Sequence, residues 1–104
     1  MEIKVNTDKN IKGSDRLEKY VSEVVESGLK RFDGKITRIE VFLKDENAGK
    51  SGPKDKKCTM EARPSGLKAV TVSCSEDHIE KAIKGSLEKL KAALNNTIGK
   101  LQTH

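Results

Sequence analysis

Two segments with helical periodicity bracket three short segments with strand periodicity, and this order limits the folds that the chain can adopt. Apolar residues recur three or four positions apart from Leu17 to Phe32, and again from Ile79 to Leu101. The segments between them alternate apolar and polar residues, as strands with one buried face do. Because an apolar helix stripe and an apolar sheet face each need a covering layer, we expect helices packed on a sheet.

Four strands are expected. The first is Glu2 to Asn6, with Ile3 and Val5 on one face, and the others span residues 36–44, 57–63 and 68–74. The residues expected to face the core from these three strands are Ile39, Val41, Leu43, Cys58, Met60, Ala62, Val70 and Val72. Residues 45–56 have the composition of a long loop. The sequence therefore predicts an α+β two-layer sandwich, β-α-β-β-β-α, whose four-stranded sheet carries both helices on one face.

Capping signals set the expected ends of the helices. Ser14 can accept a hydrogen bond from a free amide of the first turn, so we expect the first helix to begin after it. The pair Asp33-Gly34 should end that helix just after Phe32. The second helix is expected to be capped by Ser75 or Asp77, since Glu80 stands at the capping-box position relative to Asp77.

Register places the two cysteines side by side. If Met60 and Val72 both face the core, the third and fourth strands pair through a short turn, and Cys58 lies opposite Cys74. We expect both thiols to be reduced and unreactive, as small apolar groups in a cytoplasmic chain.

The residues offer no constellation for catalysis or metal binding. Cys58 and Cys74 have no metal-ligand spacing with His78, and no paired carboxylates stand apart from ordinary surface charges. An acylphosphatase-like enzyme would need a different strand order and an arginine in the loop at residues 7–13, which contains only lysines. We therefore expect a binding protein, with no enzyme activity, no cofactor and no small-molecule substrate.

Charge and aromatic content limit the kind of partner. The net charge of the chain is +5, and residues 50–68 carry six basic and two acidic side chains. A basic surface favours an anionic partner, although many solvated surfaces are rich in lysine. With one Tyr, two Phe and no Trp, the chain has little for stacking against bases. A nucleic acid would then be contacted mainly through its backbone.

Short strings over nearly the whole chain resemble those of one known family. They are Ser14 to Val21, Leu29-Lys30-Arg31-Phe32-Asp33, Ile36-Thr37-Arg38-Ile39-Glu40-Val41, Met60-Glu61-Ala62-Arg63-Pro64, Ala82-Ile83, and Lys89-Leu90 with Leu94. In this order and spacing they are similar to the short form of the ribosome hibernation promoting factor family. That family includes the ribosome-associated inhibitor A proteins and is also labelled sigma-subunit modulation protein.

The resemblance implies a fold like that of double-stranded RNA-binding domains with an added first strand. It also implies a partner, the small ribosomal subunit with its ribosomal RNA, and a position in the decoding channel that overlaps the messenger and transfer RNA sites. Such a protein would inhibit translation when growth slows, as part of a stress response. It would be a monomer off the ribosome.

The predicted RNA-binding residues are all basic. Some match the family strings, others flank the apolar stripe of the second helix, and the rest lie in the central basic segment. They are Lys89, Lys30 and Arg31; Lys81, Lys84 and Lys91; and Lys56, Lys57 and Arg63. Lysines also flank the stripes of ordinary surface helices, because their stems cover the core while the ammonium stays in water. The helix pattern alone fits both interpretations.

The second helical segment departs from the family pattern. Glu80 stands where many members have an aromatic residue, Ala92 stands where they have an arginine, and residues 95–97 replace a basic tail. These differences keep open a second hypothesis, a regulatory protein-interaction domain of the same fold with weak or no RNA binding.

The expected organisation is a single ribosome-binding domain over residues 1–104. Long members of the family carry a C-terminal domain that pairs ribosomes, and we expect this chain to lack it. Residues 1–5 show no charged segment followed by an apolar run, so we expect no secretion signal, no membrane partner and a cytoplasmic location.

Overall fold

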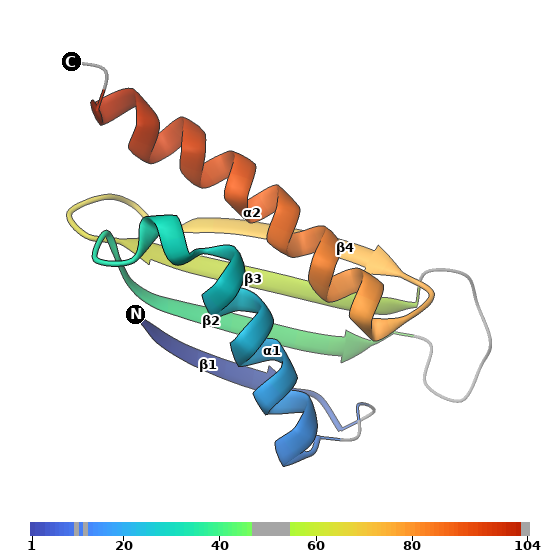
Figure 1. Cartoon of the computed structure of the whole chain (residues 1–104). Coiled ribbons are helices and arrows are strands. Elements are labelled where there is room, and N and C mark those ends of the chain that lie inside the picture. The colour runs from blue at the N-terminus through green and yellow to red at the C-terminus, as the bar shows by residue number, and fades with distance from the viewer. Residues whose placement is uncertain (10, 12, 47–54, 103–104) are drawn as a thin grey trace.

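The computed structural model describes residues 1–9, 11, 13–46 and 55–102 of the chain (Figure 1). Its elements are β1 (Glu2–Thr7), α1 (Asp15–Gly28), the 3₁₀ helix η1 (Lys30–Phe32), β2 (Ile36–Asp45), β3 (Lys56–Pro64), β4 (Val70–Glu76) and α2 (Ile79–Gln102). This is the predicted order of strands and helices with one 3₁₀ turn added. The central part of the predicted loop, residues 47–54, lies outside the described residues.

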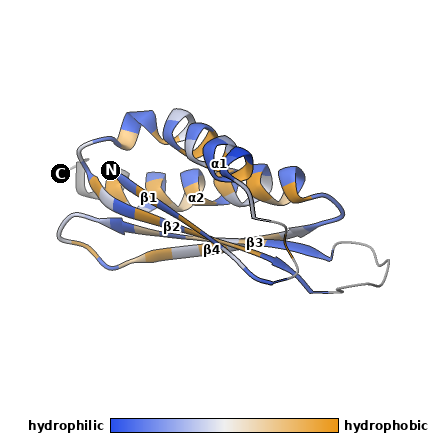
Figure 2. Ribbon diagram, turned by 90° about the horizontal axis from the view of Figure 1, so that it is seen from below, coloured by the Kyte–Doolittle hydropathy of each residue, from blue (hydrophilic) through white to orange (hydrophobic). Residues whose placement is uncertain are grey.

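The strands form one sheet in the order β1-β2-β3-β4. β1 runs parallel to β2, which the crossover through α1 allows, and the other neighbours are antiparallel. Both helices lie on the same side of the sheet and run in the same general direction, as Figures 1 and 2 show. The predicted α+β two-layer sandwich is therefore confirmed, and the described elements leave the other face of the sheet uncovered.

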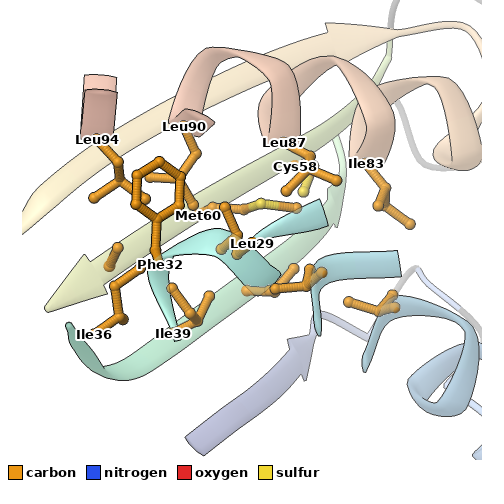
Figure 3. Close-up of a cluster of buried hydrophobic side chains, with 14 of the residues drawn as sticks. Leu29, Phe32, Ile36, Ile39, Cys58, Met60, Ile83, Leu87, Leu90 and Leu94 are labelled. Carbon is orange, nitrogen blue, oxygen red and sulfur yellow. The ribbon is translucent and has the colours of Figure 1, made fainter. Parts of the chain in front are cut away.

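The core lies between the helices and the sheet (Figure 3). Val21 and Val25 of α1, Phe32 of η1, and Leu29 between the two helices are buried, as the helical spacing predicts. The predicted inward residues of β2 and β3 are all buried: Ile39, Val41, Leu43, Cys58, Met60 and Ala62. Val70 and Val72 of β4 are only partly buried but pack against this core.

The first helix ends in two steps. Ser14 is its N-cap, as predicted, because its hydroxyl accepts a hydrogen bond from the amide of Leu17 at 3.1 Å. The α-helical part stops at Gly28, and a 3₁₀ turn continues to Phe32. A β-carbon at Gly28 would lie 2.6 Å from a methyl carbon of Leu87, so the missing side chain lets the two helices approach closely.

The start of the second helix differs from the prediction. Ser75 is not its cap, since Ser75 lies in β4 and pairs with Lys57 of β3. The first helical hydrogen bond runs from the amide of Ala82 to the carbonyl of His78, and the helix begins at Ile79. Asp77 therefore lies before the capping position. Cross-strand pairing, which continues as far as Glu76, overrides the local capping signal.

The predicted register of β3 and β4 is correct. Met60 pairs with Val72, and Cys58 pairs with Cys74. Both cysteines are free thiols, with Cys58 buried and Cys74 half-buried. Strand ends differ by small amounts from the prediction: β2 and β3 extend into the expected loop as far as Asp45 and Lys56, and β4 begins at Val70.

Candidate nucleic-acid interface

The predicted lysines of α2 stand around its buried stripe, which includes Ile83, Leu87 and Leu90. Lys81, Lys84 and Lys89 are exposed, and Lys91 is half-buried. Lys84 lies three residues before Leu87, and Lys91 lies four residues after it, so both lysines share the side of the helix on which Leu87 lies. Leu87 packs on Gly28 of α1. Lys84 and Lys91 therefore lie on the flank of α2 that faces α1.

Lys89 lies on the opposite flank of α2. Its ammonium donates a hydrogen bond to the carbonyl oxygen of Ser73 in β4 at 2.9 Å. β4 is the outer strand of the sheet, so this lysine reaches over the sheet edge.

Two of the α2 lysines are partly neutralised by neighbouring carboxylates. The ammonium of Lys81 lies 3.3 Å from Asp77, and that of Lys91 lies 3.4 Å from Glu88. The hydrogen bond from Lys81 is the main reason why the pKa of Asp77 falls below its ordinary value. Lys84 forms no ion pair with any residue that the structure describes.

Lys30 and Arg31 are exposed at the end of the first helix. The guanidinium of Arg31 lies 5.1 Å from the centre of the Phe32 ring, a cation–π contact that holds the side chain close to the surface. Lys30 borders a shallow hollow that also contains Glu23, Glu26 and Asp33. These carboxylates weaken the attraction of Lys30 for phosphate.

The three basic residues predicted on β3 do not share one face. Cys58, Met60 and Ala62 point toward the helices, so Lys57 and Arg63 lie on the uncovered face of the sheet. The guanidinium of Arg63 lies 3.0 Å from Glu61 on that same face.

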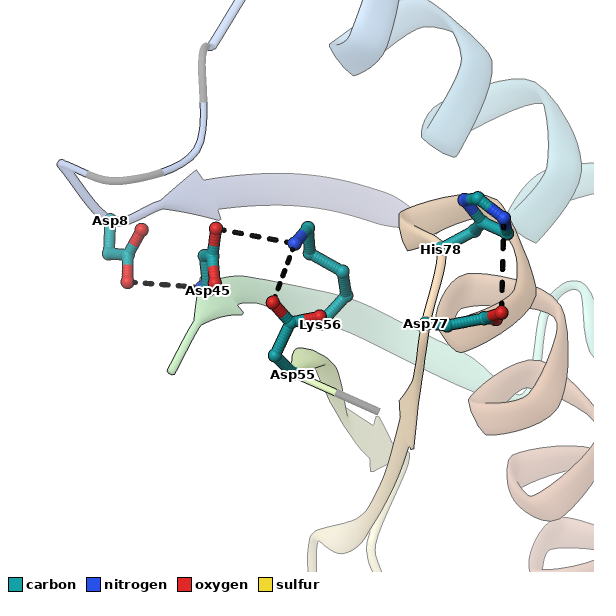
Figure 4. A network of polar contacts seen from close by, with 6 residues as sticks. All are labelled: Asp8, Asp45, Asp55, Lys56, Asp77 and His78. Atoms are coloured by element: carbon teal, nitrogen blue, oxygen red, sulfur yellow. Dashed lines mark hydrogen bonds and ion pairs between the residues drawn. The ribbon is translucent and has the colours of Figure 1, made fainter. Parts of the chain in front are cut away.

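Lys56 is held between two aspartates (Figure 4). Its ammonium lies 3.1 Å from Asp55 and 3.3 Å from Asp45. The hydrogen bond with Asp55, followed by that with Asp45, raises the pKa of Lys56 above its ordinary value. With Asp8 near the backbone of Asp45, these contacts join the ends of β1, β2 and β3. Lys56 therefore has a structural role, because its ion pairs link the ends of neighbouring strands.

The predicted basic residues thus fall into separate groups. Lys84, Lys91, Lys30 and Arg31 lie around the two helices, Lys89 lies at the β4 edge, and Lys57 and Arg63 lie on the uncovered sheet face. Sequence reasoning did not select Lys44, which lies directly opposite Lys57. The alternation of inward and outward side chains in β2 could have identified Lys44, because it places Phe42 and Lys44 on the same outward face.

The described part of the chain shows no cluster of three or more side chains suited to hold a metal ion. In the same residues, neither helix has the length and apolar character needed to cross a membrane.

Comparison with known structures identifies the fold. A ribosomal subunit interface protein from Coxiella burnetii superposes with a TM-score of 0.72 at 17% identity, over 95% of this chain and 99% of that one. The N-terminal domain of Protein Y from Thermus thermophilus gives a TM-score of 0.74 at 20% identity, over 93% and 99% of the two chains. No curated protein sequence matches the chain significantly.

The sequence itself matches a family model over residues 5–102, which is nearly the whole chain. The matched region includes every element except the first residues of β1. The resemblance noted from short strings is thus confirmed by the whole sequence and by the fold. The chain belongs to the Sigma 54 modulation protein / S30EA ribosomal protein family.

Proposed function

We propose that this protein binds the small ribosomal subunit in the decoding channel and blocks the sites of messenger and transfer RNA. The observation that supports this most is the group of basic residues beside the contact between the two helices. Leu87 packs on Gly28, Lys91 lies on the flank of α2 that faces this contact, and Lys30 and Arg31 are exposed directly after α1. Lys84 extends the group toward the N-terminus of α2.

This group suits a ribosomal RNA surface. Lysine and arginine side chains attract phosphate oxygens without reading sequence, and each phosphate they neutralise releases counterions. The folded domain presents the charges on two helices held in fixed relation by a buried core. An inhibitor acting in this way needs shape and charge, and it needs no catalytic group.

A second function has support from specific contacts. Lys81 and Lys91 are paired with carboxylates, Lys89 is bound to a backbone carbonyl, and Lys30 borders an acidic hollow. A surface whose lysines are already paired or hydrogen-bonded in this way favours a protein partner over RNA. The alternative is therefore a regulatory protein-interaction domain of the same fold with weak RNA binding.

Sedimentation with purified small subunits separates the two functions. The ribosome-binding function predicts that the protein pellets with the subunit at roughly 50 mM salt and is largely released at roughly 200 mM. Excess messenger RNA with bound transfer RNA should displace it, because the proposed sites overlap. Absence from the pellet at the lower salt concentration would contradict ribosome binding and favour the interaction domain.

A further inference from the structure

One aromatic side chain stands on the face of the sheet that the helices leave uncovered. Phe42 of β2 is 42% exposed and is the one large hydrophobic residue exposed in the described part of the chain. Its neighbours along the strand, Val41 and Leu43, point into the core on the other side. Figure 2 shows the helices confined to that other side, so the Phe42 ring faces solvent from the middle of a strand.

The row of side chains across the sheet at Phe42 is polar and uncharged. Asn6 of β1 and Thr59 of β3 are its direct partners, and Ser73 of β4 pairs with Thr59. Directly opposed side chains in neighbouring strands lie within contact distance. The ring is therefore surrounded by amide and hydroxyl groups, which donate and accept hydrogen bonds, and by no carboxylate in this row.

The next row carries two like charges side by side. Lys44 of β2 pairs directly with Lys57 of β3, and Ser75 of β4 follows Lys57. Like charges at directly opposed positions destabilise a sheet. Neither lysine forms an ion pair with a described residue. In the row on the other side of Phe42, by contrast, Glu40 is paired with Arg38 and Glu61 with Arg63. An anion placed between Lys44 and Lys57 would relieve this repulsion.

We propose that this part of the open sheet face binds an unpaired RNA nucleotide, with its base stacked on Phe42 and its phosphate between Lys44 and Lys57. Residues 42 and 44 point to the same side and lie about 7 Å apart along the strand. That spacing is comparable to the separation between a base and a phosphate within one nucleotide. Asn6, Thr59 and Ser73 supply hydrogen-bonding groups around the base edge.

Single-stranded RNA fits this surface better than a protein does. The core of a protein interface is a contiguous apolar patch, and Phe42 has no exposed apolar neighbour in its row. A base in a duplex has both faces stacked, so only an unpaired base can cover the ring. The site therefore adds one stacking position to a chain whose low aromatic content suggested little stacking against bases.

This site goes beyond the proposed function because it lies on the opposite side of the sheet from the basic residues of the helices and does not require the ribosome. Binding of a fluorescein-labelled oligoadenylate to the purified protein tests it directly by fluorescence anisotropy. Phe42→Ala should weaken binding by about tenfold or more, as expected when a stacking ring is removed. Phe42→Leu, which keeps the apolar surface and lacks the ring, should behave similarly.

Charge variants test the phosphate position. Lys44→Gln should reduce the dependence of log affinity on log salt by about 0.7, the slope expected for one contact to a single strand. Lys19→Gln removes the same charge from an exposed position on α1, on the helix side of the molecule, and should leave oligoadenylate binding unchanged. Lys19→Gln should unfold at the temperature of the parent protein, because Lys19 is exposed. Lys44→Gln should unfold at a slightly higher temperature, because it relieves the repulsion from Lys57. The Phe42 variants should remain folded, because Phe42 lies outside the core.

Three results would overturn the proposal. They are no binding of oligoadenylate at low salt, equally strong binding of its duplex with oligouridylate that does not depend on Phe42, and equal losses for Lys44→Gln and Lys19→Gln. If Phe42→Ala weakened sedimentation with the small subunit while no oligonucleotide bound, the face would contact protein and the RNA site would be wrong. Failure of sedimentation with intact oligoadenylate binding would contradict the proposed function alone.

Discussion

The ammonium of Lys89 donates a hydrogen bond to the carbonyl oxygen of Ser73 at 2.9 Å, so a lysine of α2 ties down the outer strand of the sheet. Unpaired carbonyls on an edge strand can recruit another strand, and a lysine covering one of them reduces that hazard. Lys89 is also the residue that the family strings select most directly for RNA binding. A single side chain thus has a structural contact and a proposed functional one, and the two can be separated by substitution.

Lys89→Met should lower the free energy of unfolding only slightly, and it should weaken ribosome binding to a larger extent. Methionine keeps most of the apolar stem and removes the donor, so the loss in unfolding free energy should be below about 1 kcal/mol for an exposed hydrogen bond. Urea unfolding measures the first effect, and sedimentation with small subunits measures the second. Lys84→Met, at a lysine with no ion pair to a described residue, is the control for stability and should not change it. Unfolding of Lys89→Met at the parent urea concentration would show that the contact with Ser73 does not stabilise the protein.

Reversing charge beside the helix contact should abolish ribosome binding without unfolding the domain. The double variant Lys84→Glu, Lys91→Glu places two acidic groups on the flank of α2 that faces α1, where we propose that phosphates lie. Because Lys84 is exposed and Lys91 is partly exposed, and charges at the surface contribute little to stability, thermal unfolding should stay close to that of the parent. Sedimentation at roughly 50 mM salt is the measurement, since electrostatic binding is strong there.

The matched control for that variant is Lys19→Glu, Lys68→Glu. Both lysines are exposed and form no ion pair with a described residue, and the change in net charge is the same. Binding lost equally in both double variants would mean that only the overall charge matters. Binding retained in both would place the RNA contact away from the α1-facing flank of α2.

The fold was predictable because its signals are repeated along each element. In β2, three alternate residues, Ile39, Val41 and Leu43, must all be buried together, and a shift by one residue would expose all of them. The same logic fixed the pairing of Cys58 with Cys74. The cap of α2 was predicted wrongly because it rested on local signals at Ser75 and Asp77. The backbone of Ser75 is already paired with Lys57, and Asp77 lies before the capping position of a helix that begins at Ile79.

The candidate site was less predictable, because it depends on which residues meet in space. Lys56 has the appearance of a free basic residue in the sequence, and only the folded chain places Asp45 beside it. The opposition of Lys44 and Lys57 follows from the register of β2 and β3, which a long intervening loop leaves undefined. The register of β3 and β4, which a short turn connects, was predicted correctly, whereas the contacts of Lys44 and Lys56 with other elements required the structure.

Replacing Leu90 by Ala should severely destabilise the domain. Leu90 is fully buried on the stripe of α2 that covers the sheet, and truncation of a buried leucine costs about 2–5 kcal/mol. A domain of 104 residues has a total stability of only about 5–15 kcal/mol, so much of the reserve would be lost. The control is Asn96→Ala on the exposed side of the same helix, expected to change stability by less than about 0.5 kcal/mol. A Leu90→Ala variant as stable as this control would mean that α2 is rotated.

Cys58 should resist alkylation in the folded protein. Burial raises the pKa of its thiol to about 11, the hydrogen bond with Ser86 lowering it and neighbouring Cys74 adding to the rise. At about pH 8 the thiolate, which is the reactive form, is therefore scarce, and the core excludes the reagent. Treatment with iodoacetamide, read by peptide mass spectrometry, should leave Cys58 unmodified in the native protein and modify it fully in denaturant, which is the control. Cys74, half-buried at the sheet edge, should react sooner.

An intact mass two protons lower in freshly isolated protein, the sign of a disulfide, would contradict the reduced state of the pair. Rapid native labelling of Cys58 would show that β3 and β4 open readily beneath α2.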